Sequence, residues 1–317
     1  MIRSRWVGPS IIIFLVLLIL PSFIPRFYTY ILALIFVTSL LAMSLNVVVG
    51  HGGLFQFHHG VFYGVGAYTV ALMLKKTSLP MWTGFIAGPI VAAIIGLIIG
   101  WLCVRLTRLY FAMLQISLGS LIWVIVFRWY TFTGGDDGIP GIPMPPLLSS
   151  LKNSYYFVLI IVVICLILMY MILKSPFGNT LQAIRDNPQR CEAIGINVRR
   201  HQLIAIVIAT FFAGVAGVLF VALERSVFAD LLFWTLSLEI FIMCLLGGWF
   251  TFAGPILGAA IIVALRTFVG IFTEYWTLIL GVVLILIIFF LPEGIVGYFQ
   301  ELFKPGAKEV AERGKPR

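Results

Sequence analysis

The sequence predicts an all-α integral membrane protein with about ten transmembrane helices. Of its 317 residues, 62% are hydrophobic and only 10% are charged, a composition that soluble domains of this size do not have. The apolar blocks run for about 20 residues, the length that a helix needs to cross a bilayer. Because these blocks lack the two-residue alternation of barrel strands, helices are favoured over a β-barrel.

The apolar blocks place the expected spans at residues 6–24, 28–49, 53–74, 81–104, 108–130, 154–173, 202–223, 235–250, 254–272 and 275–292. With the N-terminus in the cytoplasm, 14 of the 21 Lys and Arg residues fall on the cytoplasmic side and 6 on the outer side. The last one, Arg266, lies inside a span. This excess of positive charge predicts that both termini are cytoplasmic.

The same distribution explains the net charge of +9 by membrane orientation. Nucleic-acid binding is not indicated, because the basic residues lie at span ends and form no single patch. Residues 1–295 then form one transmembrane domain, with an outer loop at 131–153 and a cytoplasmic loop at 174–201. Residues 296–317 are expected to form a polar cytoplasmic tail.

The third span begins with a run of glycines, Gly50, Gly52 and Gly53. Such a run suits either close packing of helices or a break between two half-helices, as in many transporters, and both readings stay open. The pattern GGxFxF occurs at 52–57 and again at 247–252, which hints at an internal repeat. Glycines around the second copy predict that the eighth and ninth spans are short or interrupted.

Polar side chains inside apolar spans are costly in lipid, so they are candidates for a translocation pathway. Those expected to line it are Asn46, Gln56, His58, His59, Gln115, Ser117 and Glu239. Hydrogen bonding to a neighbouring helix is the structural alternative, and for Glu239 an ion pair with Arg266. A metal site is not favoured, because the adjacent histidines point to different sides of a helix and no carboxylate lies near them in sequence.

The cytoplasmic loop 174–201 carries the punctuation of two helices. Ser175 and Asn187 are good N-cap residues, and each is followed by a proline, which suits the first helical position. Gly195 supplies a left-handed residue that ends the second helix at about Ile194. This loop is either a structured linker between two spans or a docking element for a cytoplasmic partner.

Several long motifs carry a resemblance to a known family: LNVVVGHGGL, RLYFAMLQISLG, TGGDDGIPGIP, SPFGNTLQAIRDNPQRCEAIGINVRR and GGWFTFAGPILGAA. In these the sequence resembles the permease family of bacterial branched-chain amino-acid ABC importers, and within it the M-type subunit. The resemblance covers residues from about 30 to 295. His51, His58 and the bulky stretch 249–252 depart from the family pattern, which leaves the substrate open among amino acids, amides and urea.

The resemblance implies a multi-pass subunit of the bacterial inner membrane. It implies as partners a second permease subunit, two cytoplasmic ATPase subunits and a substrate-binding protein. ATP and Mg²⁺ would be held by the ATPase subunits, and no cofactor is expected in this chain, which lacks a P-loop sequence and shows no catalytic constellation. We therefore expect a transport subunit and not an enzyme.

The resemblance also implies that the loop with Glu192, Ala193 and Gly195 contacts the ATPase. The flanking residues expected to take part in this coupling are Arg185, Asp186, Asn187 and Asn197. An ion-coupled secondary transporter of a small polar solute is the alternative function. It would need an essential membrane acid, for which Glu239 is the candidate.

Overall fold

The computed structural model describes residues 16–302, apart from 78, 79, 107, 274, 276, 277, 280, 283, 284, 286–288 and 290–293. Within these residues every regular element is a helix, and β-structure is limited to one isolated bridge between Ile139 and Val227. The prediction of an all-helical chain is confirmed. The first and last expected spans, 6–24 and 275–292, fall largely outside the described residues.

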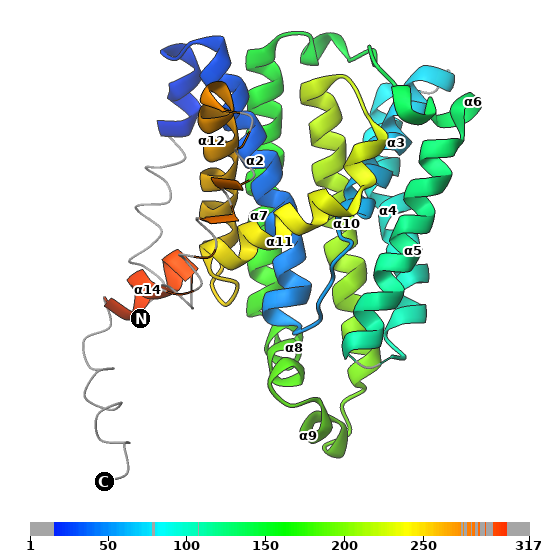
Figure 1. Ribbon diagram of the computed structural model, residues 1–317, viewed down its shortest axis with the longest axis vertical. Coiled ribbons are helices and arrows are strands. Elements are labelled where there is room, and N and C mark those ends of the chain that lie inside the picture. The colour runs from blue at the N-terminus through cyan, green and yellow to red at the C-terminus, as the bar shows by residue number, and fades with distance from the viewer. Residues whose placement is uncertain are drawn as a thin grey trace.

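Six helices of the described part are long and apolar enough to cross a membrane. They are α2 (Arg26–Asn46, continued by the π-helical turn η2, Val47–His51), α4 (Met81–Cys103), α5 (Arg108–Arg128), α7 (Leu151–Lys174), α10 (Val198–Glu224) and α12 (Gly254–Phe272). Figure 1 shows most of them running along the long axis of the molecule. They match six of the expected spans within a few residues, and the total of ten stays a prediction.

Two expected spans are short: the third unexpectedly so, and the eighth as the glycines around it predicted, whereas the ninth keeps its expected length as α12. The third was expected to be helical over 53–74, but residues 53–59 are not helical and α3 covers only Gly60–Lys76. The chain leaves the helix here because Gly53 has a φ of +66°. The eighth, expected at 235–250, is the 14-residue helix α11 (Trp234–Gly247). At 1.5 Å per residue it is about 21 Å long, less than the bilayer core.

The remaining helical elements lie at the ends and edges of the bundle. They are η1 (Leu20–Ser22), α6 (Tyr130–Thr133), η3 (Gly135–Asp137), η4 (Pro146–Leu148), α8 (Pro176–Asp186), α9 (Pro188–Ala193), η5 (Ala229–Leu232) and α14 (Gly294–Leu302). The expected tail therefore begins as a helix, α14, which contacts α11 and α12. Residues 303–317 lie outside the described part of the chain.

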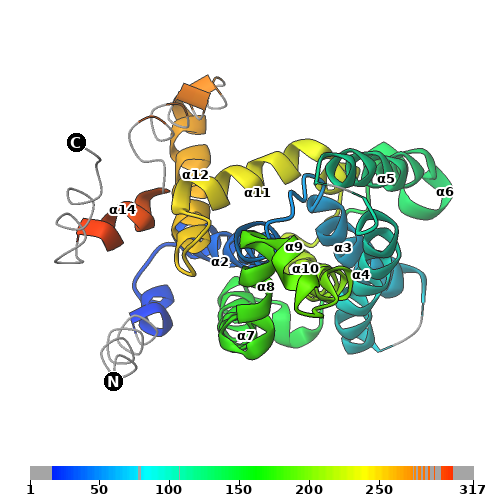
Figure 2. The same cartoon turned by 90° about the horizontal axis from the view of Figure 1, so that it is seen from below.

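Helix α2 is the centre of one half of the bundle, where it contacts α7, α10, α11 and α12 (Figure 2). The other half is built on α10, which packs on α3 and α4 through small residues. A Cβ added at Gly217 would overlap the carbonyl oxygen of Tyr63, and one at Gly66 would lie 2.5 Å from the carbonyl oxygen of Gly214. The glycines of α10 therefore allow close packing of helices.

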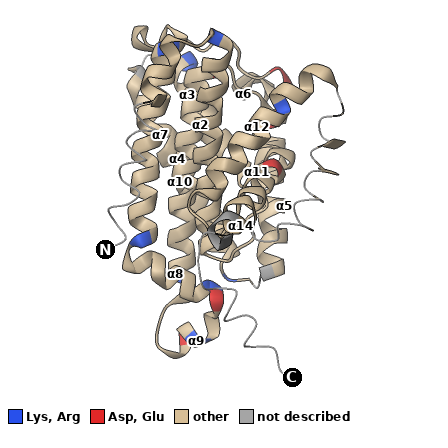
Figure 3. Cartoon of the chain, turned by 90° about the vertical axis from the view of Figure 1, so that its left-hand side faces the viewer, with Lys and Arg blue, Asp and Glu red and all other residues tan. Residues whose placement is uncertain are grey.

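Lysine and arginine residues gather at the two ends of the bundle (Figure 3). One end carries α8 and α9, and the other carries α6 and the expected outer loop 131–153 (Figure 1). Hydrogen bonds fix that loop: Lys75 Nζ donates to the Pro140 carbonyl at 2.7 Å, and Arg225 Nη2 donates to the Ser149 carbonyl at 2.6 Å. The amide of Ile139 also donates to the Val227 carbonyl at 2.8 Å.

Candidate functional site

Helices α8 and α9 protrude from one end of the bundle as a capped pair (Figure 1). Ser175 Oγ accepts from the Gly178 amide at 3.5 Å, and Asn187 Oδ1 accepts from the Arg190 amide at 3.0 Å. Both expected N-caps are confirmed. Asn197, grouped with the coupling residues on the resemblance, has the same local structure, because its Oδ1 caps α10 at 3.0 Å.

The end of α9, residues 192–195, is held rigidly by backbone hydrogen bonds, and we call these residues the knob. Gly195 has a φ of +88°, its amide donates to the Glu192 carbonyl, and the Ile196 amide donates to the Cys191 carbonyl, each at 3.0 Å. This pair of hydrogen bonds is a Schellman motif, and the predicted glycine stop is confirmed. Cys191 is buried in a small cluster with Ile184 and Val198, separate from the main core, so the short helix has its own support.

The tip of this knob is exposed and partly apolar. Glu192, Ala193 and Gly195 are exposed, and Ile194 between them has 77% of its surface accessible. Sequence reasoning missed Ile194, although an isoleucine next to a predicted turn glycine was a visible signal. A rigid apolar tip flanked by a carboxylate suits docking into a pocket of a partner protein.

Arg185, at the end of α8, connects the protruding pair to the membrane part. Its Nη1 donates to the Gly50 carbonyl at 2.8 Å, and its stem packs so closely on Gly53 that an added Cβ there would lie 2.6 Å from Arg185 Cγ. The guanidinium also lies 5.0 Å from the centre of the Phe250 ring and pairs with Asp186 at 2.9 Å. One side chain thus contacts η2 with the turn after it and the loop after α11.

The two GGxFxF copies lie at two helix breaks, and the chain just before the first copy touches the second break. Positive φ values at Gly53 (66°) and Gly248 (109°) mark them, after η2 and after α11. Asn46 Nδ2 donates to the Thr251 carbonyl at 3.4 Å, and a Cβ added at Gly50 would overlap the Trp249 carbonyl. We call residues 50–53 and 247–252 the paired breaks. They show that the glycine run at 50–53 both breaks a helix and allows close packing.

Three of the expected pathway side chains are buried without hydrogen bonds. Gln56, His58 and Gln115 are at most 2% exposed, and five of their polar atoms have no partner among the described residues. His58 and Gln115 are brought near each other, because the His58 ring packs against Gly119, one helical turn from Gln115 on α5, and Gln56 is two residues before His58 in the chain. An unpaired buried polar group costs about 1–3 kcal/mol, so a cluster of them points to water or solute in another state.

The other expected pathway residues lie elsewhere. His59 is buried but shares a 2.8 Å hydrogen bond with Ser44 on α2. Ser117 is on the exposed side of α5, and its hydroxyl donates to the Met113 carbonyl at 3.0 Å. Glu239 lies 3.8 Å from Arg266, which is the ion pair named as its structural alternative.

Replacing Gln56 with leucine is expected to stabilise the folded protein and to slow transport. An apolar side chain of similar size removes two unpaired polar atoms, so the free energy of unfolding should rise by about 1–3 kcal/mol. Thermal unfolding in detergent and solute uptake in cells would measure the two effects. Ser44→Ala is the matched control, because it removes the partner of His59 and should destabilise the protein; destabilisation by Gln56→Leu would contradict the prediction.

A bundle of membrane-length helices, with touching helix breaks, buried unpaired polar groups and a capped helix pair at one end, is the architecture of a solute transport subunit. The family model for the permease component of branched-chain amino acid transport systems matches residues 27–288, and the chain belongs to this family. It is thus a permease subunit of an ABC-type importer, as the sequence resemblance predicted.

The relatives agree with this family. The chain is 29% identical to the high-affinity branched-chain amino acid transport system permease protein LivM of Escherichia coli K12, over 87% of this chain and 71% of the relative. It is 23% identical to the probable LivM protein of Methanocaldococcus jannaschii, over 86% and 94% of the two chains. A guanosine ABC transporter permease of Bacillus subtilis, NupQ, is 27% identical over 25% of each chain. No solved structure matches the chain significantly.

Proposed function

We propose that this chain moves branched-chain or related amino acids across the bacterial inner membrane, together with a second permease subunit. Two cytoplasmic ATPase subunits would supply the energy, and a separate binding protein would deliver the solute at the α6 end. The names of the LivM relatives support branched-chain amino acids as the substrate class. The name of NupQ gives guanosine as the solute of a related permease, so the solute can differ within such relatives. The excess of positive charge expected on the α9 side supports a cytoplasmic position for α8 and α9.

The observation that carries the proposal is the contact of Arg185 with both paired breaks. In this mechanism the ATPase binds the knob at Glu192–Gly195. Closure of the ATPase subunits then moves α9 and α8 as one body, since both helices are capped. Arg185 passes this movement to the Gly50 carbonyl and to the loop after α11. A push on the paired breaks would change the arrangement of α2, α3, α11 and α12, the helices that these breaks connect.

The buried polar cluster supports a pathway near α3 and α5. Two of its members, Gln56 and His58, lie just before the N-terminus of α3, where the helix dipole favours the carboxylate of an amino acid. Amide and imidazole groups supply both donors and acceptors without a fixed charge. In the described state these groups are covered, so solute would reach them only after the helices rearrange.

Uptake in cells that lack the ATPase subunits tests the proposal. Loss of uptake, with the permease still present in the membrane, is expected. Uptake that persists without the ATPases and depends on a proton or sodium gradient would favour the alternative, an ion-coupled transporter. In that case Glu239→Gln should abolish the transport, because Glu239 is the membrane acid such coupling would need.

A further inference from the structure

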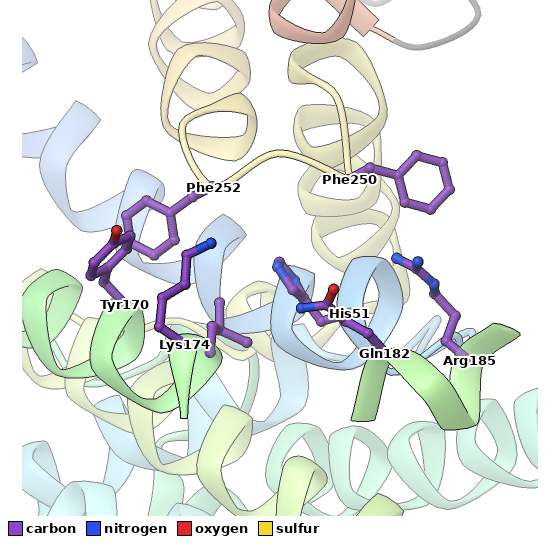
Figure 4. Close-up of a pocket in the computed structure, with 8 residues that line it drawn as sticks. His51, Tyr170, Lys174, Gln182, Arg185, Phe250 and Phe252 are labelled. Atoms are coloured by element: carbon purple, nitrogen blue, oxygen red, sulfur yellow. The ribbon is translucent and has the colours of Figure 1, made fainter. Parts of the chain in front are cut away.

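A cavity of about 240 Å³ lies at the α9 end of the bundle, between the end of α7, helix α8, η2 and the loop after α11 (Figure 4). Its lining includes His51, Tyr170, Lys174, Gln182, Arg185 and Phe252. None of its eight lining residues is a carboxylate. Since liquid water occupies about 30 Å³ per molecule, the space suits several waters or one hydrated anionic group.

The hydrogen-bond donors that line this cavity come from different helices. The Lys174 ammonium lies 6.0 Å from the centre of the Tyr170 ring, between the Tyr170–Phe252 pair and His51 (Figure 4). Gln182 and Arg185 approach from α8. Arg185 is partly neutralised by Asp186, whose carboxylate lies outside the lining, so Lys174 contributes the main uncompensated charge of the cavity. Ammonium, guanidinium and amide groups around one space favour a phosphate-type anion.

The position of the cavity favours a lipid as the source of that anion. On α7, the turns before Lys174 expose apolar side chains: Ile164, Ile167, Leu168 and Met171 are each between 46% and 62% accessible. This apolar band is where acyl chains would lie, and Lys174 is at its end. Basic residues at the cytoplasmic end of a membrane helix are placed to contact anionic headgroups.

We propose that this cavity binds the phosphate of an anionic phospholipid whose acyl chains lie along α7. The headgroup would contact α7 and α8 and face the loop after α11, three elements that belong to different parts of the fold. A bound lipid would therefore stabilise the arrangement of α8 and α9 relative to the paired breaks. The site is independent of which solute the permease carries.

The full-length chain in neutral detergent, titrated with phosphatidylglycerol or phosphatidylcholine, tests this site. Native mass spectrometry would count bound lipid, and the melting temperature would report stabilisation. We expect phosphatidylglycerol to bind and stabilise, and Lys174→Gln to weaken that binding roughly fivefold, the effect of one basic residue. Lys174→Arg should keep it. Lys152→Gln is the matched control, since it removes the same charge from the other end of α7.

Elution profile and helical circular dichroism establish that each variant is folded. Equal binding of both lipids, or the same phosphatidylglycerol affinity in Lys174→Gln and Lys152→Gln, would overturn the proposal. Stabilisation by inorganic phosphate alone, with no extra effect of phosphatidylglycerol, would assign the cavity to a soluble anion instead. If Lys174→Gln left lipid binding unchanged but weakened binding of the ATPase subunits, the cavity would belong to the interface with the ATPase.

Discussion

Replacing Arg185 with alanine is expected to lower ATP-driven uptake at least tenfold while the protein still inserts and folds. The change removes a charge-assisted hydrogen bond to the Gly50 carbonyl, worth about 1.5–3 kcal/mol, and the contact with the Phe250 ring. A loss of about 1.4 kcal/mol in the coupling between two sites is a tenfold effect. The helices α8 and α9 keep their own caps and can still meet the ATPase.

The diagnostic measurement compares uptake with ATP hydrolysis in the reconstituted complex. If Arg185 transmits movement, hydrolysis persists while uptake falls, so the ratio of solute to ATP drops. Arg105→Ala is the control, because Arg105 also stacks on an aromatic ring, that of Trp101, but is at the end of α4, away from α8. If Arg185→Ala prevented assembly of the complex, Arg185 would act in docking of the ATPase instead. If uptake were unchanged, Arg185 would have no part in transmitting the movement.

Replacing Gly217 with valine is expected to prevent stable folding. A Cβ at this position would overlap the carbonyl oxygen of Tyr63, a backbone atom that cannot rotate away. Helices α3 and α10 would have to separate, and overpacking of this kind costs about 1–3 kcal/mol for a single added carbon, with more for a branched side chain. The fraction of protein recovered as a monodisperse peak after stepwise heating in detergent measures the effect.

Gly270→Val is the matched control for this substitution. Gly270 also lies within a membrane-length helix, α12, but among the described residues no atom outside its own stretch of helix is within 4 Å of an added Cβ. Both variants gain the same β-branched side chain in a helix, so their difference isolates the close approach of α3 to α10. Equal recovery of the two variants would mean that the bundle can relax around Gly217.

Local chemistry made helices α8 and α9 predictable. Ser175, Asn187 and Gly195 act within one helical turn, through an N-cap or a positive φ, so their pattern is readable without the fold. The membrane-length helices were predictable for a similar reason, because span length follows from hydropathy. Residues 53–59 were not, since they lie within a block read as one span and leave the helical conformation through a single glycine torsion and contacts from distant segments.

The contacts between helices and loops that are far apart in the chain could not be predicted from the sequence. Arg185 was expected to take part in coupling as a residue of the cytoplasmic loop, but its bond to Gly50 spans 135 positions of the chain and was not foreseen. The GGxFxF repeat was visible, but the contact of Gly50 with Trp249, which joins the paired breaks, depends on how α2 and α11 pack together. The cluster of Gln56, His58 and Gln115 was anticipated residue by residue; its lack of hydrogen-bond partners could come only from three-dimensional packing.

The loop at the α6 end has a consequence for how a delivery protein would meet this surface. Because Lys75, Arg225 and the Ile139–Val227 bridge already hold its backbone, association needs little ordering of the loop. Ordering a flexible loop would use free energy that the contact itself supplies, and a loop already ordered avoids this loss. More of the binding free energy then remains to discriminate between a solute-loaded and an empty delivery protein.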